Sequence, residues 1–293
     1  MNIHLLSGLL LFLTAIWGWT FTVVKDAVAG YGVVSFLAVR FAIGAICLVV
    51  LGWRKVTRQS LILGGLIVVI LAAGYLFQTF GLRHTTATNS GLITSLFVVC
   101  APLANRALFG VRTTKLLWAA IGVSLLGLVL LTGTGPVPLA WGDWLTLGAA
   151  AGFGTQIALL DRYSRGHDTL GLAVTKVASA AVVLLVAWPL SETFSWPSND
   201  VWFALLLTGV VATALGFYIQ TLAQRHLPAA RVAVIFTQKS VFAMLFGYLL
   251  AGDRLTGIQV LGAVLMIAAV GLAEIAPAVL REGRLSVEES TGE

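Results

Sequence analysis

The chain has 293 residues, of which 59% are hydrophobic and only 10% charged, and its mean hydropathy is +0.97. A soluble domain usually carries about 25% charged residues, so this composition excludes a soluble enzyme, a DNA-binding protein and a disordered chain. Length alone would allow two soluble domains, but lipid must be the solvent for most of this chain. The formal net charge of +6 therefore has to be explained by a membrane, not by a nucleic-acid partner.

Ten apolar runs follow one another along the chain, each close to the roughly 20 residues that a helix needs to cross a bilayer. They cover approximately residues 4–24, 33–52, 61–82, 90–109, 116–133, 142–160, 169–190, 201–223, 231–250 and 256–276. The runs are continuous and lack the period-two alternation of membrane β-strands, which excludes a β-barrel. We therefore expect an all-α integral membrane protein with ten transmembrane helices, the first of which is not a cleaved signal peptide.

Lysine and arginine residues predict the orientation of these spans, because they gather on the cytoplasmic side of membrane proteins. With the N-terminus inside, the outer segments hold only Lys25, Arg83 and Arg254. The cytoplasmic segments hold Arg54, Lys55, Arg58, Arg106, Arg112, Lys115, Arg162, Arg165, Arg225, Arg231, Arg281 and Arg284. Both termini are therefore predicted to be cytoplasmic, and three bases, Arg40, Lys176 and Lys239, fall within spans.

Part of the sequence occurs twice. The pattern Gln78-Thr79-x-x-x-Arg83-His84-x-x-Ala87 returns, at an offset of 142, as Gln220-Thr221-x-x-x-Arg225-His226-x-x-Ala229. At an offset of 136, Trp17-Gly18 matches Phe153-Gly154 and Arg40 matches Lys176. We expect a five-helix repeat at 1–135, a second repeat at 136–280 and a cytoplasmic tail at 281–293. An odd number of spans inverts the second repeat, a plan typical of secondary transporters with a substrate site near the midplane.

The residues resemble those of the drug/metabolite transporter superfamily. The resemblance is carried by Trp17-Gly18 in the first span, Val39-Arg40-Phe41 in the second, a short basic loop before the fourth and Gly110-x-Arg112-x-Thr114 leading into the fifth. Within the superfamily the chain resembles EamA-type exporters, among them bacterial exporters of aromatic and other amino acids. The resemblance covers roughly residues 1–280 and implies a multi-pass protein of the bacterial inner membrane. The chain departs from the pattern at Lys176, where an arginine is expected, and at Lys239, where the first half has Phe97.

Three basic residues inside the spans are the first candidates for a site. A charge at the bilayer centre costs about 2.5–3.5 kcal/mol on insertion scales and usually faces a cavity. Lys239 lies near the middle of its span, and we expect it to bind a carboxylate or phosphate of the cargo. Arg40 and Lys176 lie closer to span ends, where we expect gate or vestibule cations. Snorkelling to the interface or bonding to backbone carbonyls is the alternative explanation for all three.

Aromatic and amide side chains are the second set of candidates, since a small-molecule site is mostly apolar with a few polar anchors. Gln78 and Gln220 are repeat counterparts that either bind substrate or hold helices together. Ordinary helix packing would explain any single aromatic residue of the set. The predicted substrate-binding residues, besides Lys239, are Trp17, Tyr75, Gln78, Thr94, Phe153, Gln156, Tyr218 and Gln220.

Missing motifs separate transporters from other classes. No acid lies deep in a span, which argues against a proton relay through the membrane, and no phosphate-binding loop is present for ATP hydrolysis. The four histidines lie at span edges without metal-binding spacing, so we expect neither an enzyme nor a bound metal or cofactor.

The predicted function is gradient-driven export of amino acids, aromatic and other neutral ones, and of similar small metabolites by alternating access. A monomer in the lipid bilayer with a small-molecule substrate is expected. The alternatives are a proton-coupled exporter of drugs, cationic compounds or other metabolites from the same superfamily, and a channel.

Overall fold

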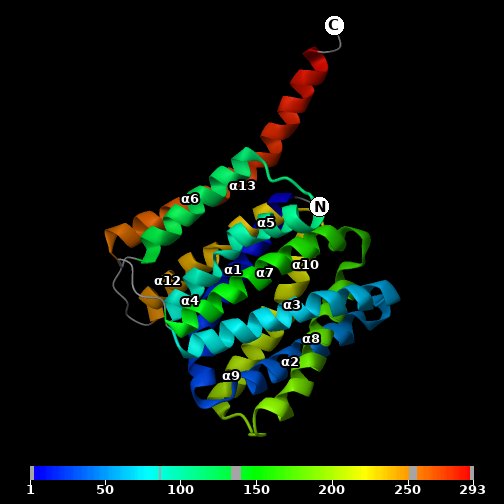
Figure 1. Cartoon of the computed structure of the whole chain (residues 1–293), viewed down its shortest axis with the longest axis vertical. Helices are drawn as coiled ribbons and strands as arrows, with labels where there is room; N and C mark the ends of the chain where they lie inside the picture. Colours follow the sequence, from blue (N-terminus) through cyan, green and yellow to red (C-terminus); the bar gives the residue numbers. More distant parts are fainter. Residues whose placement is uncertain (1–2, 86, 133–139, 251–255, 291–293) are drawn as a thin grey trace.

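The computed structural model describes residues 3–85, 87–132, 140–250 and 256–290, whose regular structure is helical throughout (Figure 1). The helices are α1 (Ile3–Gly30), α2 (Val33–Gly52), α3 (Arg58–Arg83), α4 (Ala87–Thr94), α5 (Phe97–Phe109), α6 (Lys115–Thr132), α7 (Trp141–Tyr163), α8 (Thr169–Ser191), α9 (Asn199–Leu206), the π-helical η3 (Leu207–Leu215), α10 (Gly216–Gln224), α11 (Ala229–Phe236), α12 (Gln238–Leu250) and α13 (Gly257–Ser290). Two short 3-10 turns, η1 (Trp53–Lys55) and η2 (Ser164–Gly166), follow α2 and α7.

The predicted spans are present as helices. In the described ranges, eight helical stretches are long and apolar enough to cross a bilayer. Two further helices bring the number of predicted spans found as helical segments to ten. The apolar part of α6, Lys115–Leu131, is slightly shorter than the other spans. Helix α7 has 23 residues but includes buried polar ones such as Thr146 and Gln156. The expectation of an all-helical membrane protein with about ten spanning segments is confirmed.

Equivalent helices of the two halves pack against each other. α2 lies against α8, and α6 lies against α13; Figure 1 shows the latter pair along one edge of the bundle. The first helix of each half also contacts the fourth span of the other half, which consists of two helices. Helix α1 contacts α11 and α12, and α7 contacts α4 and α5. The space enclosed by α1, α3, α7 and α10 is thus built from both halves.

Two predicted spans are interrupted at equivalent positions, which the sequence did not predict. The run at 90–109 divides into α4 and α5 around Ser95, and the run at 231–250 divides into α11 and α12 at Thr237, its counterpart at the offset of 142. Each hydroxyl bonds back to its own helix, Ser95 Oγ to the Gly91 carbonyl at 2.9 Å and Thr237 Oγ1 to the Val234 carbonyl at 2.7 Å. Such bonds compete with the helical ladder. The second interruption forms without a proline, because Met244 stands at the position that matches Pro102.

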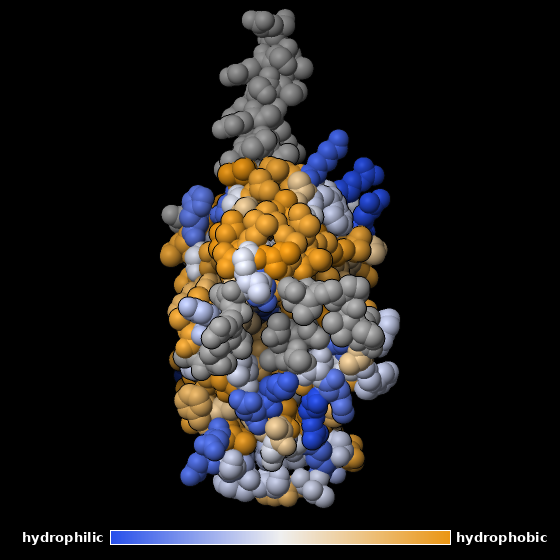
Figure 2. All heavy atoms as spheres, turned by 90° about the vertical axis from the view of Figure 1, so that its left-hand side faces the viewer, coloured by the Kyte–Doolittle hydropathy of each residue, from blue (hydrophilic) through white to orange (hydrophobic). Residues whose placement is uncertain are grey.

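Large apolar side chains cover the outside of the bundle. Val50, Val69, Val186 and Ile267 are each more than half exposed, as expected for helices that face lipid. Figure 2 shows one end of the bundle, with apolar residues gathered in its upper part and hydrophilic residues below them. Residues 281–290, expected as a tail, continue helix α13, which projects beyond the other helices in Figure 1.

Candidate functional site

A cavity of about 80 Å³ lies between the two halves. A single water needs roughly 10–15 Å³ of such space, so several waters or a small organic group would fit. Seven aromatic residues line it, Trp17, Phe21, Tyr75, Phe97, Phe153, Phe217 and Phe236. The basic and amide residues are Arg40, Gln78, Gln156, Gln220 and Lys239, and the rest are Thr20, Val24, Leu71, Thr79, Leu82 and Ile157.

Lys239 is the second residue of α12 and lies just after the interruption at Thr237. Its side chain is 6% exposed, and its Nζ lies 4.5 Å from the ring centre of Phe97 and 5.5 Å from that of Phe21. In the described part of the chain no carboxylate pairs with it. Aromatic faces stabilise a cation by about 0.5–2 kcal/mol, less than a buried charge loses with its hydration. An anion from the cargo would supply the missing partner.

Arg40 also lines the cavity, from α2. Its Nε donates to Thr213 Oγ1 at 2.9 Å, and its guanidinium carbon lies 5.0 Å from the centre of the Tyr75 ring. The interaction with Thr213 joins the first half to the π-helical η3 of the second half. Arg40 therefore holds the wall of the cavity together while presenting a positive charge to it.

Lys176, the counterpart of Arg40, lies behind the cavity wall. Its Nζ donates to Thr221 Oγ1 at 3.4 Å and lies 4.4 Å from the centre of the Phe217 ring. Phe217 is the counterpart of Tyr75 at the offset of 142, so each half places one cation over an equivalent aromatic ring. Phe217 lines the cavity and Lys176 does not, because the Phe217 ring lies between the lysine and the cavity.

The amide side chains form two hydrogen-bonded pairs. Gln78 donates to Thr94 Oγ1 at 3.1 Å, between α3 and α4, and Gln220 donates to Gln156 Oε1 at 3.1 Å, between α10 and α7. All three glutamines line the cavity. Thr94 does not line it, because its hydroxyl is fully buried between Gln78 and the Ser90 carbonyl.

The aromatic residues pack edge to face across the two halves. Tyr75 contacts Phe153 with ring centres 5.1 Å apart, and Trp17 contacts Phe236 at 5.0 Å. Trp17 Nε1 also donates to the Ala212 carbonyl at 2.9 Å, within η3. A π-helical turn shifts the backbone hydrogen bonds by one residue, and this carbonyl accepts the indole N–H. That interaction explains a tryptophan in the interior of the first span.

Tyr218 does not line the cavity either. It follows Phe217 on α10, and one residue of helix rotates a side chain by about 100°. Phe217 faces the cavity, whereas Tyr218 packs half-buried against the hydrophobic cluster of α2, α8 and α9. Three predicted site residues, Thr94, Tyr218 and Lys176, therefore lie next to the cavity and not on its wall.

Sequence reasoning did not put forward several residues that line the cavity. The aromatic ones are Phe97, Phe217 and Phe236. The repeat could have identified Phe217, because it corresponds to the predicted Tyr75. It could also have identified Thr20, which corresponds to Gln156 at the offset of 136.

The cavity extends further towards one end of the bundle. Val24 and Leu82, near the C-terminal ends of α1 and α3, line it. Among the described residues, their counterparts Leu160 and Gln224 at the other end do not. Gln224 instead bonds to the Ile157 carbonyl at 2.8 Å. The distribution of lysine and arginine assigns the end with Val24 and Leu82 to the outside.

Known proteins support this architecture. The profile of the EamA-like transporter family matches the chain twice, at residues 6–133 and 140–274. An uncharacterized transporter of Archaeoglobus fulgidus is 34% identical over 256 residues, which cover 87% of this chain and 81% of that protein.

More distant relatives are named as transporters as well. The uncharacterized inner membrane transporter YedA of Escherichia coli is 23% identical over 261 residues, covering 87% of this chain and 85% of YedA. The uncharacterized transporter YoaV of Bacillus subtilis is 23% identical over 271 residues, covering 86% of this chain and 91% of YoaV. One solved crystal structure superimposes with a TM-score of 0.76 at 18% identity, covering 94% of this chain and 98% of that one. At that identity the likeness concerns the fold.

Proposed function

The chain belongs to the EamA-like transporter family, and we propose that it exports small metabolites with a carboxylate group, above all aromatic and other neutral amino acids. The family consists of transporters and not of enzymes, so the chain acts on a small molecule across a lipid bilayer. We place it in the bacterial inner membrane as a monomer, with two inverted five-helix repeats that alternate in access around the central cavity.

One observation carries the proposal: Lys239 lies in an aromatic cavity with no carboxylate to pair with it in the described part of the chain. A cargo carboxylate compensates this charge, and the surrounding rings accept an apolar or aromatic side chain. Among the described residues, none that lines the cavity is acidic. This supports gradient-driven export over a proton relay or a preference for cationic drugs.

Transport by purified protein in proteoliposomes tests the proposal. The panel contains labelled phenylalanine, leucine, a nucleoside and a quaternary amine, each with and without an imposed pH gradient. We expect saturable uptake and counterflow of the amino acids without a pH gradient. Uptake restricted to the quaternary amine, or strictly dependent on the gradient, contradicts the proposal, and uptake that does not saturate indicates a channel.

A further inference from the structure

Two glutamine side chains face each other on the wall of the cavity that the second half supplies. Gln156 on α7 and Gln220 on α10 are each 2% exposed, and Gln220 Nε2 donates to Gln156 Oε1 at 3.1 Å. Both residues line the cavity. The pair is therefore buried in the protein and still adjacent to the space that a cargo would occupy.

Each glutamine of the pair keeps one amide atom without a partner. Gln156 Nε2 and Gln220 Oε1 are buried and make no hydrogen bond to the described residues. If both amides are flipped, so that oxygen and nitrogen exchange places, Gln156 donates to Gln220 instead. One N–H donor and one carbonyl acceptor are then still free, with their positions exchanged. The pair thus presents a donor beside an acceptor, whichever way the amides are oriented.

The corresponding residues of the first half have partners. Thr20, the counterpart of Gln156, donates to the Trp17 carbonyl at 2.9 Å, and Gln78, the counterpart of Gln220, donates to Thr94 at 3.1 Å. Among the described residues that line the cavity, a buried donor and a buried acceptor without partners are accordingly found at the Gln156–Gln220 pair. Buried polar atoms are nearly always hydrogen-bonded, so a polar group supplied from elsewhere would complete the bonding of this pair.

We propose that Gln156 and Gln220 form a subsite that recognises the ammonium and carboxylate of an α-amino acid together. The ammonium donates to the free carbonyl of the pair, the carboxylate accepts from the free N–H, and Lys239 adds positive charge in the same cavity. This inference rests on the proposed function and deepens it. A carboxylic acid without the amine leaves the acceptor unpaired, and an amine without the carboxylate leaves the donor unpaired, which disfavours both.

Competition in proteoliposomes tests the subsite. Uptake of labelled phenylalanine is measured against unlabelled phenylalanine, 3-phenylpropanoate, which lacks the amine, and phenethylamine, which lacks the carboxylate. For the wild type we expect phenylalanine to compete at least tenfold better than either analogue. In Gln220→Met and in Gln156→Met we expect the preference over one or both analogues to fall to about threefold or less.

Gln224→Met is the matched control. Gln224 lies one turn after Gln220 on α10 and also has an unpaired carbonyl oxygen, but it does not line the cavity. We expect this variant to keep the tenfold preferences. If a single variant does not fold, the double variant Gln156→Met/Gln220→Met removes both amides and leaves no unpaired atom, and both preferences should be lost.

The possible results separate the subsite from the function itself. Wild-type uptake of phenylalanine with preferences that the Gln156 and Gln220 variants leave unchanged overturns the subsite alone. Equal loss of preference in Gln224→Met does the same. Absence of carrier-mediated phenylalanine uptake in the wild type overturns both the amino-acid function and the subsite.

Discussion

Lys239 packs against its own counterpart from the other half of the chain. Its Nζ lies 4.5 Å from the centre of the ring of Phe97, which occupies the equivalent position of the first repeat. At this pair one half supplies a cation and the other half a ring. The unpaired amide atoms of Gln156 and Gln220 belong to the same half as Lys239, whereas Arg40 and Gln78 line the cavity from the other half, so the duplicated scaffold encloses a site whose two sides differ in their polar groups.

Replacing Lys239 tests the charge of the site. We expect Lys239→Ala to lower uptake of carboxylate-bearing cargo at least tenfold, because the compensating cation is lost. The folded yield should not fall, since the substitution removes a buried charge that has no partner among the described residues and with it the cost of burying that charge. Uptake by proteoliposomes and size-exclusion profiles in detergent measure the two quantities, with the exposed Arg54→Ala as the control. Unchanged transport in a well-expressed variant would exclude this role for Lys239.

The spans and the midplane lysine could be predicted from the sequence, because both depend on local composition. Which side chains face the cavity depends on geometry that composition does not encode. The π-helical stretch Leu207–Leu215 changes the rotation of α10. The geometry of a regular α-helix therefore does not reliably predict whether Phe217 or Tyr218 faces the cavity. Likewise, the position of Lys176 behind Phe217 follows from contacts between segments that lie far apart along the chain.

Lys176→Met is expected to stabilise the protein. Lys176 is fully buried, and its polar contact among the described residues is a long hydrogen bond of 3.4 Å to Thr221. Methionine fills a similar volume without the cost of burying a charge. We expect the midpoint of thermal unfolding in detergent to rise by about 2–4 °C for each kcal/mol gained. A lower midpoint would show that the charge itself supports the fold, and Lys55→Met, an exposed site, controls for a general effect.

Arg231 and Glu274 form an ion pair that ties α11 to α13, and Arg231 also donates to Ser7 of α1. The sequence placed Arg231 among the cytoplasmic bases, but its side chain is almost completely buried. Removing Glu274 leaves the buried charge of Arg231 without its partner, so Glu274→Leu should lower the free energy of unfolding by about 3 kcal/mol. The double variant Arg231→Met/Glu274→Leu should recover most of this loss. Thermal midpoints of the wild type, of both single variants and of the double variant decide, and additive losses would contradict the coupling.

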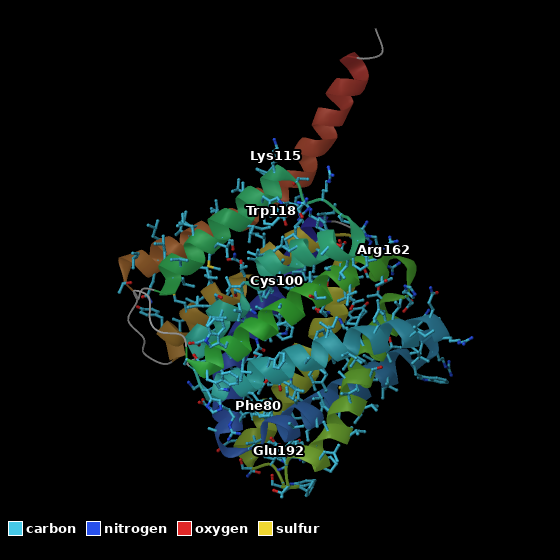
Figure 3. All side chains as sticks on the ribbon, viewed as in Figure 1. Phe80, Cys100, Lys115, Trp118, Arg162 and Glu192 are labelled. Atoms are coloured by element: carbon cyan, nitrogen blue, oxygen red, sulfur yellow. The ribbon has the colours of Figure 1, made fainter. Side chains whose placement is uncertain are left out.

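Glu192, which follows α8 and is labelled in Figure 3, contributes to stability in a pH-dependent way by binding the beginning of α2. Partial burial alone would raise its pKa, but hydrogen bonds from the Ser35 hydroxyl and from backbone N–H groups of α2 outweigh that effect. The pKa therefore lies below its ordinary value of 4.5. Because the folded pKa is lowered, the stabilisation is complete above the unfolded pKa and is lost as the pH falls through the folded one.

The comparison with Glu192→Gln measures this contribution. We expect the wild type to unfold at a higher temperature than the variant at about pH 7, and this difference to shrink as the pH falls from about 4.5 towards 3. A difference that is the same at both ends of this range would mean that the carboxylate charge is not responsible.

Cysteine labelling tests the end at which the cavity opens. Leu82 lines the cavity near the end of α3, and its counterpart Gln224 lies at the opposite end and outside the lining. In a chain whose native Cys47 and Cys100 are changed to alanine, a membrane-impermeant maleimide added to intact cells should modify Leu82→Cys and leave Gln224→Cys unmodified. Substrate that fills the cavity should slow the reaction at Leu82→Cys, because the thiol shares its space. Modification of Gln224→Cys alone would reverse both the orientation predicted from the basic residues and the direction of the opening.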